Sequence, residues 1–275
     1  MLIGILHTFQ CLRDRLGAIA AIRPRAILAD LGKIEGHPFW RLDFPGDPAL
    51  RICLASGIHG DEPAGVEAIL HFIENFAFPF SLTCFPCMNP PALLAGSRCG
   101  PSGIDLNRGF GKGAERGANC LFERAVGERR WDLFIDLHED YEAEGFYALE
   151  VGEGCASVGC SAARDLSDAG FPVERKATLR KMLEEEGGYP LLAVEDGVAF
   201  LSRTEGGGGE PQAPFMARMH AERAITFETP SRLPFEARVR MHEIALRAAI
   251  AAIFSPKVLS ALPSFDPWSG RRAAR

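Results

Sequence analysis

Short apolar runs alternate with segments of helical spacing along most of the chain. Residues 51–56 (R-I-C-L-A-S) form a nearly continuous apolar run, which is typical of a strand covered on both faces. Pro63 stands where the first residue of a helix is expected, ahead of the helical spacing of residues 67–76. The same patterns predict strands over 81–85, 133–137, 146–150 and 224–227, and helices over 115–129, 157–169, 177–186 and 234–254. This alternation predicts an α/β fold, a mostly parallel mixed sheet with helices on both faces.

The N-terminal region has a different pattern. Residues 1–24 predict a helix or an arm, and residues 26–31 and 38–44 predict the two strands of a β-hairpin. Residues 89–113 are rich in Gly, Pro and Asn and predict a loop. We expect a single domain over residues 1–275, with the arm and hairpin over about 1–48 and a loose tail over about 256–275.

Composition and charge narrow the class of protein. Hydrophobic residues make up 47% and charged residues 24%, which is ordinary for a globular domain and argues against disorder. The net charge of −6 gives no electrostatic basis for binding nucleic acid or an anionic membrane, so we expect neither partner. The sequence has no run of 18 apolar residues, so it predicts no membrane-spanning helix. Residues 1–6 are apolar, but no basic segment precedes them, so we expect no export signal and a cytoplasmic protein.

The eight cysteines are expected to be reduced and buried rather than paired in disulfides. Cys84 and Cys87 form a C-x-x-C, but no second pair accompanies it, as a zinc ribbon would require. A redox motif would open a helix, and Pro86 lies between the two thiols. We interpret them as thiols on and after a buried strand.

Four residues with acid–base or metal-binding side chains follow three of the apolar strands. His59 and Glu62 come after residues 51–56, His138 after 133–137, and Glu228 after 224–227. Ligands of such sheets bind beyond the carboxyl ends of the strands. Two histidines and one carboxylate are the three protein ligands of a catalytic zinc, which keeps a fourth position for water. Glu228 is then the carboxylate that takes the proton from this water and passes it to the leaving nitrogen.

Four motifs occur in order along the chain: H-G-D-E-P-A-G from residue 59, S-R-C-G-P-S-G-I-D-L-N-R from 97, D-L-H from 136 and T-F-E-T-P from 226. In these motifs, from about residue 26 to 246, the chain resembles the zinc carboxypeptidase family, which includes the succinylglutamate desuccinylase and aspartoacylase type of deacylase. The resemblance implies one catalytic domain with a zinc carboxypeptidase-like (phosphorylase/hydrolase-like) three-layer sandwich, and one Zn²⁺ per chain.

The resemblance also implies a role for each matched residue. The zinc ligands are His59, Glu62 and His138, and Glu228 is the general base. Asn107 and Arg108 would grip the free carboxylate of the substrate, which suits a planar guanidinium that binds carboxylates bidentately. Arg98 would stabilise the oxyanion.

The sequence departs from the family before the general base. Secreted carboxypeptidases carry a tyrosine in that loop, whereas residues 204–223 contain none. Four glycines at 206–209 predict a mobile flap. Arg218 lies ten residues before Glu228. It either contacts an acidic group of the substrate or is an ordinary surface arginine.

Four further carboxylates near the motifs have weaker assignments. Asp136 lies two residues before His138 on the same strand face, so it either orients that ring or is simply buried and bonded to backbone. Asp105 is expected to order its loop. Glu139 and Asp140 are expected to be solvated beyond the strand end, although a second metal using one of them is conceivable.

Three functions compete at this point. The first is a metallocarboxypeptidase-like hydrolase that cleaves an amide next to a free carboxylate in a small peptide. The second is an N-acyl amino acid deacylase on the same scaffold. The third is a catalytically idle relative, which the intact set of His59, Glu62, His138 and Glu228 disfavours. Other catalytic signatures fail, since the chain has no G-x-S-x-G, and G-F-G-K-G at 109–113 lacks the spacing of a phosphate-binding loop.

Overall fold

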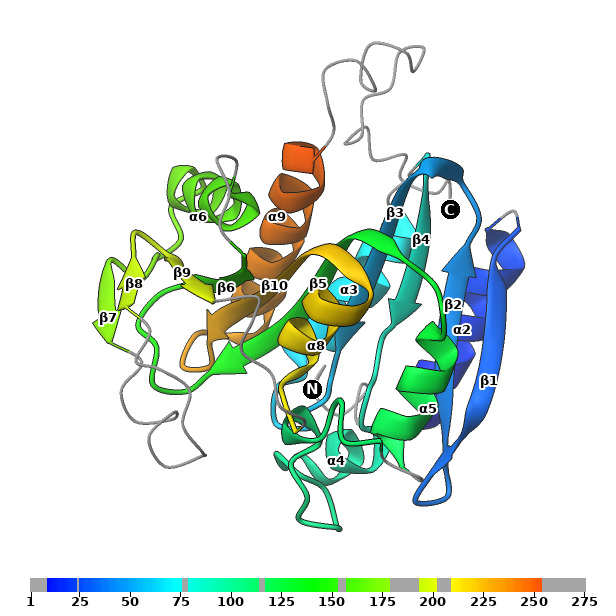
Figure 1. Ribbon diagram of the computed structural model, residues 1–275. Helices are drawn as coiled ribbons and strands as arrows, with labels where there is room; N and C mark the ends of the chain where they lie inside the picture. The colour runs from blue at the N-terminus through cyan, green and yellow to red at the C-terminus, as the bar shows by residue number, and fades with distance from the viewer. Residues whose placement is uncertain are drawn as a thin grey trace.

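A single mixed β-sheet organises the protein (Figure 1). The structure, a computed structural model, describes residues 9–23, 25–75, 79–113, 117–152, 157–178, 193–201 and 209–253. Within these residues the sheet has ten strands in the order β1-β2-β4-β3-β5-β10-β6-β9-β8-β7. The strands are β1 Ile27–Ile34, β2 His37–Phe44, β3 Asp47–Ser56, β4 Phe80–Phe85, β5 Trp131–Asp140, β6 Tyr147–Val151, β7 Lys176–Thr178, β8 Ala193–Glu195, β9 Val198–Leu201 and β10 Ala221–Pro230.

Parallel pairing is concentrated at the centre of this sheet. Strands β4, β3, β5 and β10 are parallel neighbours, and β6 pairs in parallel with β9. The flanking pairs β1·β2, β2·β4, β10·β6, β7·β8 and β8·β9 are antiparallel. Because the four central strands run the same way, their carboxyl ends meet at one edge, where the expected functional residues lie.

Helices cover both faces of the sheet, which confirms the expected fold class (Figure 1). One core cluster joins the sheet to α2, α3, α6 and α9, and a second joins the opposite face to α5 and α8. The helices are α2 Phe9–Ile22, α3 Ala64–Asn75, α4 Pro90–Ala95, α5 Ala118–Val126, α6 Val158–Asp168, α8 Gln212–Met219 and α9 Phe235–Ile253, with a 3₁₀ turn η1 at Leu106–Arg108. None of the helices in the described residues is long and apolar enough to cross a bilayer.

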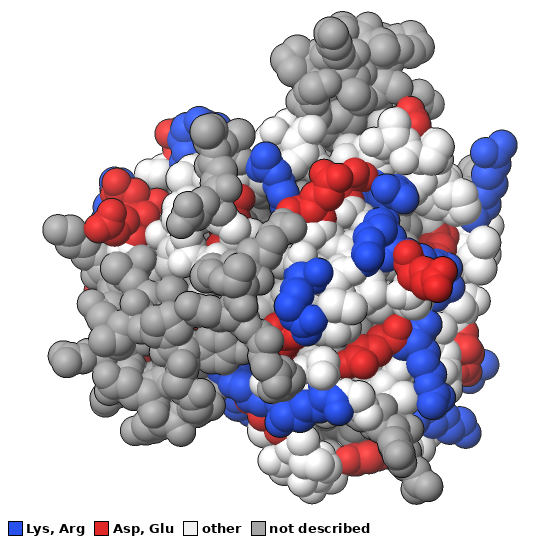
Figure 2. Space-filling view, viewed as in Figure 1, with Lys and Arg blue, Asp and Glu red and all other residues white. Residues whose placement is uncertain are grey.

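The N-terminal helix and hairpin form as expected. The hairpin turns at Glu35 and Gly36, which both have positive φ, 48° and 87°. Cys84 lies in β4 and Cys87 just after it, both are buried, and both are free thiols. On the face shown in Figure 2, basic and acidic side chains are intermingled over the described part of the surface.

Several expectations were wrong in detail. The segment 89–113 is not all loop, because Asn89 caps α4, accepting a hydrogen bond from Ala92 N, and η1 follows later in the segment. The helix expected over 177–186 is contradicted at its start, where residues 177 and 178 belong to β7. The rest of that segment lies outside the described residues, as do the glycines 206–208 and the tail. The expected flap also contains α8, whose Pro214 lies in the first turn, where a missing N–H costs nothing.

Candidate metal centre

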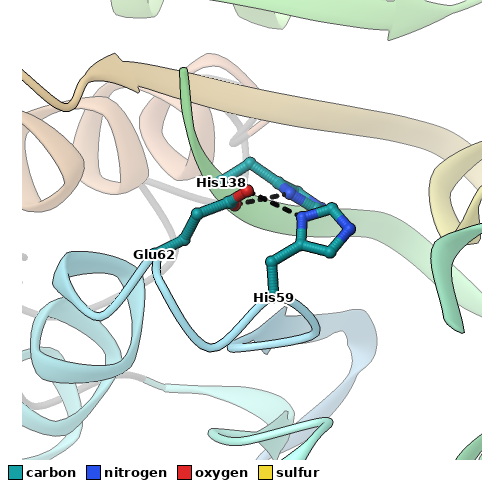
Figure 3. Close-up of side chains that lie close together, drawn as sticks. All are labelled: His59, Glu62 and His138. Carbon is teal, nitrogen blue, oxygen red and sulfur yellow. Dashed lines mark hydrogen bonds and ion pairs between the residues drawn. The ribbon is translucent and has the colours of Figure 1, made fainter. Parts of the chain in front are cut away.

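Three buried side chains converge at the carboxyl ends of β3 and β5 (Figure 3). His59 lies in the turn after β3, Glu62 lies two residues before α3, and His138 lies near the end of β5. The Nδ1 atom of His59 is 2.7 Å from Glu62 Oε1, and the Nδ1 atom of His138 is 2.8 Å from Glu62 Oε2. Ligand atoms of all three residues lie within 4.8 Å of one another. Two imidazole nitrogens and one carboxylate thus surround a single point, as a metal site requires.

The turn that carries His59 is shaped by two glycines with different functions. Gly57 has a φ of +64°, which favours glycine. Gly60 has an ordinary φ, but a Cβ there would lie 1.9 Å from the backbone C and O of Ala92 in α4. Its N–H donates to Ser97 O. The absence of a side chain at Gly60 therefore lets the turn pack directly against α4.

The second ring nitrogen of each histidine faces a carboxylate. His138 Nε2 is 3.1 Å from Asp136 Oδ2, and His59 Nε2 is 3.3 Å from Asp105 Oδ1. Such contacts fix the tautomer of a histidine so that the other nitrogen is free for a metal. Of the two interpretations considered for Asp136, the geometry therefore favours the one in which it orients His138. Asp105 orders its loop as expected, since it accepts from Asn107 N at 2.8 Å, and it also holds His59.

The charged side chains of the cluster shift one another's pKa values. Burial by itself would lower the pKa of His138, but the carboxylates of Asp136 and Glu62 outweigh it and raise this pKa well above its usual value. Burial likewise opposes the raised pKa of His59, which results from Glu62 and Asp105. Burial would raise the pKa of Glu62, yet the two imidazoles hold it far below normal. The cluster therefore favours cationic partners, and a divalent ion would replace the protons on the histidines.

Glu228 is half-buried on β10, and its Cα is the register partner of His138 on β5. Burial raises the pKa of its carboxyl group well above normal, opposed by His138 and reinforced by Glu62 and Asp140. A raised pKa moves a carboxylate toward the neutral range in which a general base works best.

Arg98, Asn107 and Arg108 lie beside the cluster. Arg98 Nη1 is 3.7 Å from Glu62 Oε1, while its Nε and Nη2 donate to Asp105 Oδ2 at 3.2 and 2.9 Å. Asn107 is buried, and its Oδ1 accepts from Gln212 N at 2.8 Å, which attaches the loop to α8. Arg108 donates to the carbonyl oxygen of Asn107 at 2.9 Å and lowers the pKa of Asp105 together with His59 and Arg98, against the effect of burial.

Arg218 has a different environment. It forms an ion pair with buried Glu210, and its guanidinium lies 5.9 Å from the ring centroid of Phe215. Its Nη1 contacts the sulfur of Met219. These contacts give it a structural function on α8, and its expected contact with substrate stays a prediction.

Glu139 and Asp140 are not solvated, contrary to expectation. Strand β5 extends three residues beyond the predicted end, and both side chains are buried. Glu139 accepts from Ala64 N at the start of α3 at 2.6 Å and pairs with Arg238 of α9. Asp140 accepts the hydroxyl hydrogen of Tyr147 at 2.8 Å. The sequence carries no local signal for these pairs, because each partner lies on a different element.

Comparisons with known proteins give a family-model match to part of the chain and several solved structures of similar fold. Residues 48–154 match the family model of the succinylglutamate desuccinylase/aspartoacylase catalytic domain. The chain is similar in fold to a candidate metallopeptidase of Shewanella amazonensis SB2B (24% identity, TM-score 0.72), covering 89% of this chain and 92% of that one. It is also similar to a metallo-carboxypeptidase of Burkholderia cenocepacia (16%, TM-score 0.62), covering 89% and 68%. A third similar structure is the tripeptide-bound cell-shape determinant Csd4 of Helicobacter pylori (15%, TM-score 0.54), covering 77% and 54%. A sequence comparison with curated proteins gives no match.

The expected resemblance to the zinc carboxypeptidase family, with its succinylglutamate desuccinylase and aspartoacylase branch, is supported by the family-model match over residues 48–154. The family-model match begins within β3, the strand that leads to His59, and ends beyond His138, so it contains the three converging side chains. The expectation of a hydrolase of the carboxypeptidase and desuccinylase/aspartoacylase type is supported at that level.

Proposed function

We propose that the protein is a zinc-dependent hydrolase that cleaves an amide bond next to a free carboxylate. The observation that carries this proposal is the convergence of two imidazole Nδ1 atoms and the Glu62 carboxylate within 4.8 Å, with Glu228 in register beside them. The donor set fits the metal, because each imidazole is also oriented by a carboxylate at Nε2.

His59, Glu62 and His138 would hold the metal. A zinc ion bound there would supply a water of lowered pKa and a Lewis acid for the scissile carbonyl.

The chain's own residues supply the remaining chemistry. Glu228 takes a proton from the attacking water at its carboxylate and delivers it to the leaving nitrogen. Arg98, held in place by two hydrogen bonds to Asp105, places positive charge beside the developing oxyanion. Asn107 and Arg108 bind the free carboxylate of the substrate. The planar guanidinium of Arg108 can bind both carboxylate oxygens at once.

Two substrate classes are supported by different observations. A small peptide is supported by the carboxypeptidase and tripeptide-bound structures that share the fold. An N-acyl amino acid is supported by the family model, which is that of desuccinylase and aspartoacylase catalytic domains. We favour the peptide, and keep the deacylase as the second candidate.

The test compares zinc-loaded and chelator-treated protein on a panel of dipeptides and tripeptides and on a parallel panel of N-acyl amino acids. We expect about one zinc per chain, turnover on one panel and loss of turnover on chelation. Glu228→Gln should keep its zinc and lose roughly 10²- to 10⁴-fold in kcat. Absence of zinc uptake would remove the mechanism, and a zinc-replete protein inactive on both panels would favour an idle relative.

A further inference from the structure

The sheet places two aromatic side chains beside Glu228, one on each neighbouring strand. The Cα of Glu228 is the register partner of His138 on β5 and of Tyr147 on β6. Side chains directly opposite each other on neighbouring strands point to the same face, with Cβ atoms about 4.5–5.5 Å apart in an antiparallel pair. Tyr147, Glu228 and His138 therefore form one row across three strands.

The hydroxyl of Tyr147 fixes where its ring lies. It donates to Oδ2 of Asp140 at 2.8 Å, and Asp140 is on β5, in register with Pro230 of β10. Strand β10 lies between β5 and β6, so the phenol must cross β10 to make this bond. The crossing lies between the levels of Glu228 and Pro230, which puts the ring against the Glu228 side chain.

Both ends of this bridge are held. Tyr147 is only 3% exposed and packs with Ala143, Val194 and Ala199. The second oxygen of Asp140 accepts from Glu142 N at 2.7 Å. Burial, reinforced by nearby carboxylates, raises the pKa of Tyr147 well above its usual value, so the phenol stays a hydrogen-bond donor. The Tyr147 side chain is therefore held in one position by its packing and by its hydrogen bond to Asp140.

We propose that Tyr147, tethered by Asp140, is a positioning residue that fixes the Glu228 carboxylate in the row beside His138. The assignment rests on the proposed function for the action of Glu228 as base. The phenol hydrogen is committed to Asp140, so Tyr147 acts through Glu228 and not on the substrate. A base displaced by about 1 Å can lose on the order of 10²-fold in rate. A side chain that holds Glu228 in one rotamer therefore has a measurable effect on kcat.

The test uses zinc-loaded Tyr147→Leu, Tyr147→Phe and Asp140→Asn, with Tyr141→Phe as the matched control because Tyr141 is 72% exposed. We expect Tyr147→Leu to lower kcat by roughly 100-fold, and Tyr147→Phe, which keeps the ring but loses its tether, by roughly 10-fold. KM and zinc content should not change in either variant. The double variant Tyr147→Phe/Asp140→Asn should lose no more than the stronger single variant, because hydroxyl and carboxylate act as one pair.

A second readout needs no turnover. In crystal structures of the metal-free proteins, Glu228 should occupy one rotamer in the parent and in Tyr141→Phe, and several in Tyr147→Leu. If the parent hydrolyses nothing, the proposed function fails, but the comparison of rotamers still tests whether Tyr147 positions Glu228. If Tyr147→Leu does not fold, Tyr147→Phe and Asp140→Asn carry the test.

Three results would overturn the assignment. The first is a kcat within about twofold of the parent in every variant. The second is a loss of kcat that follows loss of zinc or of folded protein, which is a structural effect only. The third is a lower kcat with Glu228 unmoved, which would mean that the phenol contacts the substrate directly.

Discussion

Asp136→Asn tests whether the carboxylates behind the histidines set the affinity of the metal centre. Asp136 is 1% exposed, and its Oδ2 lies 3.1 Å from His138 Nε2. Its Oδ1 has no hydrogen-bond partner among the described residues, so the charge is directed at the imidazole. The substitution keeps the shape of the side chain and removes the charge.

The expected loss follows from this geometry. Removing a carboxylate that orients a metal-bound histidine typically weakens metal binding 10- to 100-fold, or about 1.4–2.7 kcal/mol. Burial prevents screening by solvent, so we expect the Asp136→Asn loss near the upper end of that range. Asp105→Asn should lose less, because Asp105 is 18% exposed in its side chain and its distance to His59 Nε2 is 3.3 Å.

The assay is a competition titration of zinc against a chromophoric chelator at neutral pH, with melting curves to confirm folding. Asp132→Asn is the matched control, since Asp132 lies at the opposite end of β5 and accepts from Arg51 N at 2.6 Å. An Asp136→Asn affinity equal to the parent, or a loss equal to that of Asp132→Asn, would refute the reasoning.

Two further predictions concern the scaffold. His71 contacts Glu243 of α9 and Glu67 of α3, which raise its pKa to about 9. Its contribution to the free energy of unfolding is therefore complete below pH 6.5 and is lost as the pH rises through 9. The side chain is 41% exposed, so after allowance for solvent screening we expect about 1 kcal/mol, measured as the difference in unfolding free energy between parent and His71→Gln at pH 6, with none at pH 10. Gly60→Ala should abolish zinc binding, because its Cβ would overlap the backbone of Ala92. Gly17→Ala, whose Cβ would meet nothing within 4 Å, should bind zinc normally in the same titration, and equal affinities for the two variants would contradict the packing argument.

The central strands could be predicted from the sequence because each is buried on both faces. Residues 51–56 and 133–137 are mostly apolar runs, and such runs can be recognised without knowledge of the strands they pair with. The polar residues just beyond those runs were therefore found as well, including all three that converge in space.

The missed features depend on contacts between distant elements. Strands β8 and β9 span only three and four residues, which is too short for a periodic signal. Helices α4 and α8 carry prolines in their first turns, and those prolines favour a loop when a single sequence is considered. The end of β5 was set too early because Glu139 and Asp140 are polar, and their burial is made possible by Arg238 and Tyr147.

The alternation of side chains along β5 explains how one strand can organise the whole site. Residues 136, 138 and 140 face one side, where they orient a ring, supply that ring, and tether the phenol beside Glu228. Glu139 faces the other side, where it caps α3, the helix that follows Glu62, and pairs with α9. A slip of one residue in the register of β5 would exchange these two sets, so the metal ligands and the supports of the adjoining helix would be lost together. The convergence of His59, Glu62 and His138 therefore depends on the observed pairing of β5 with β3 and β10.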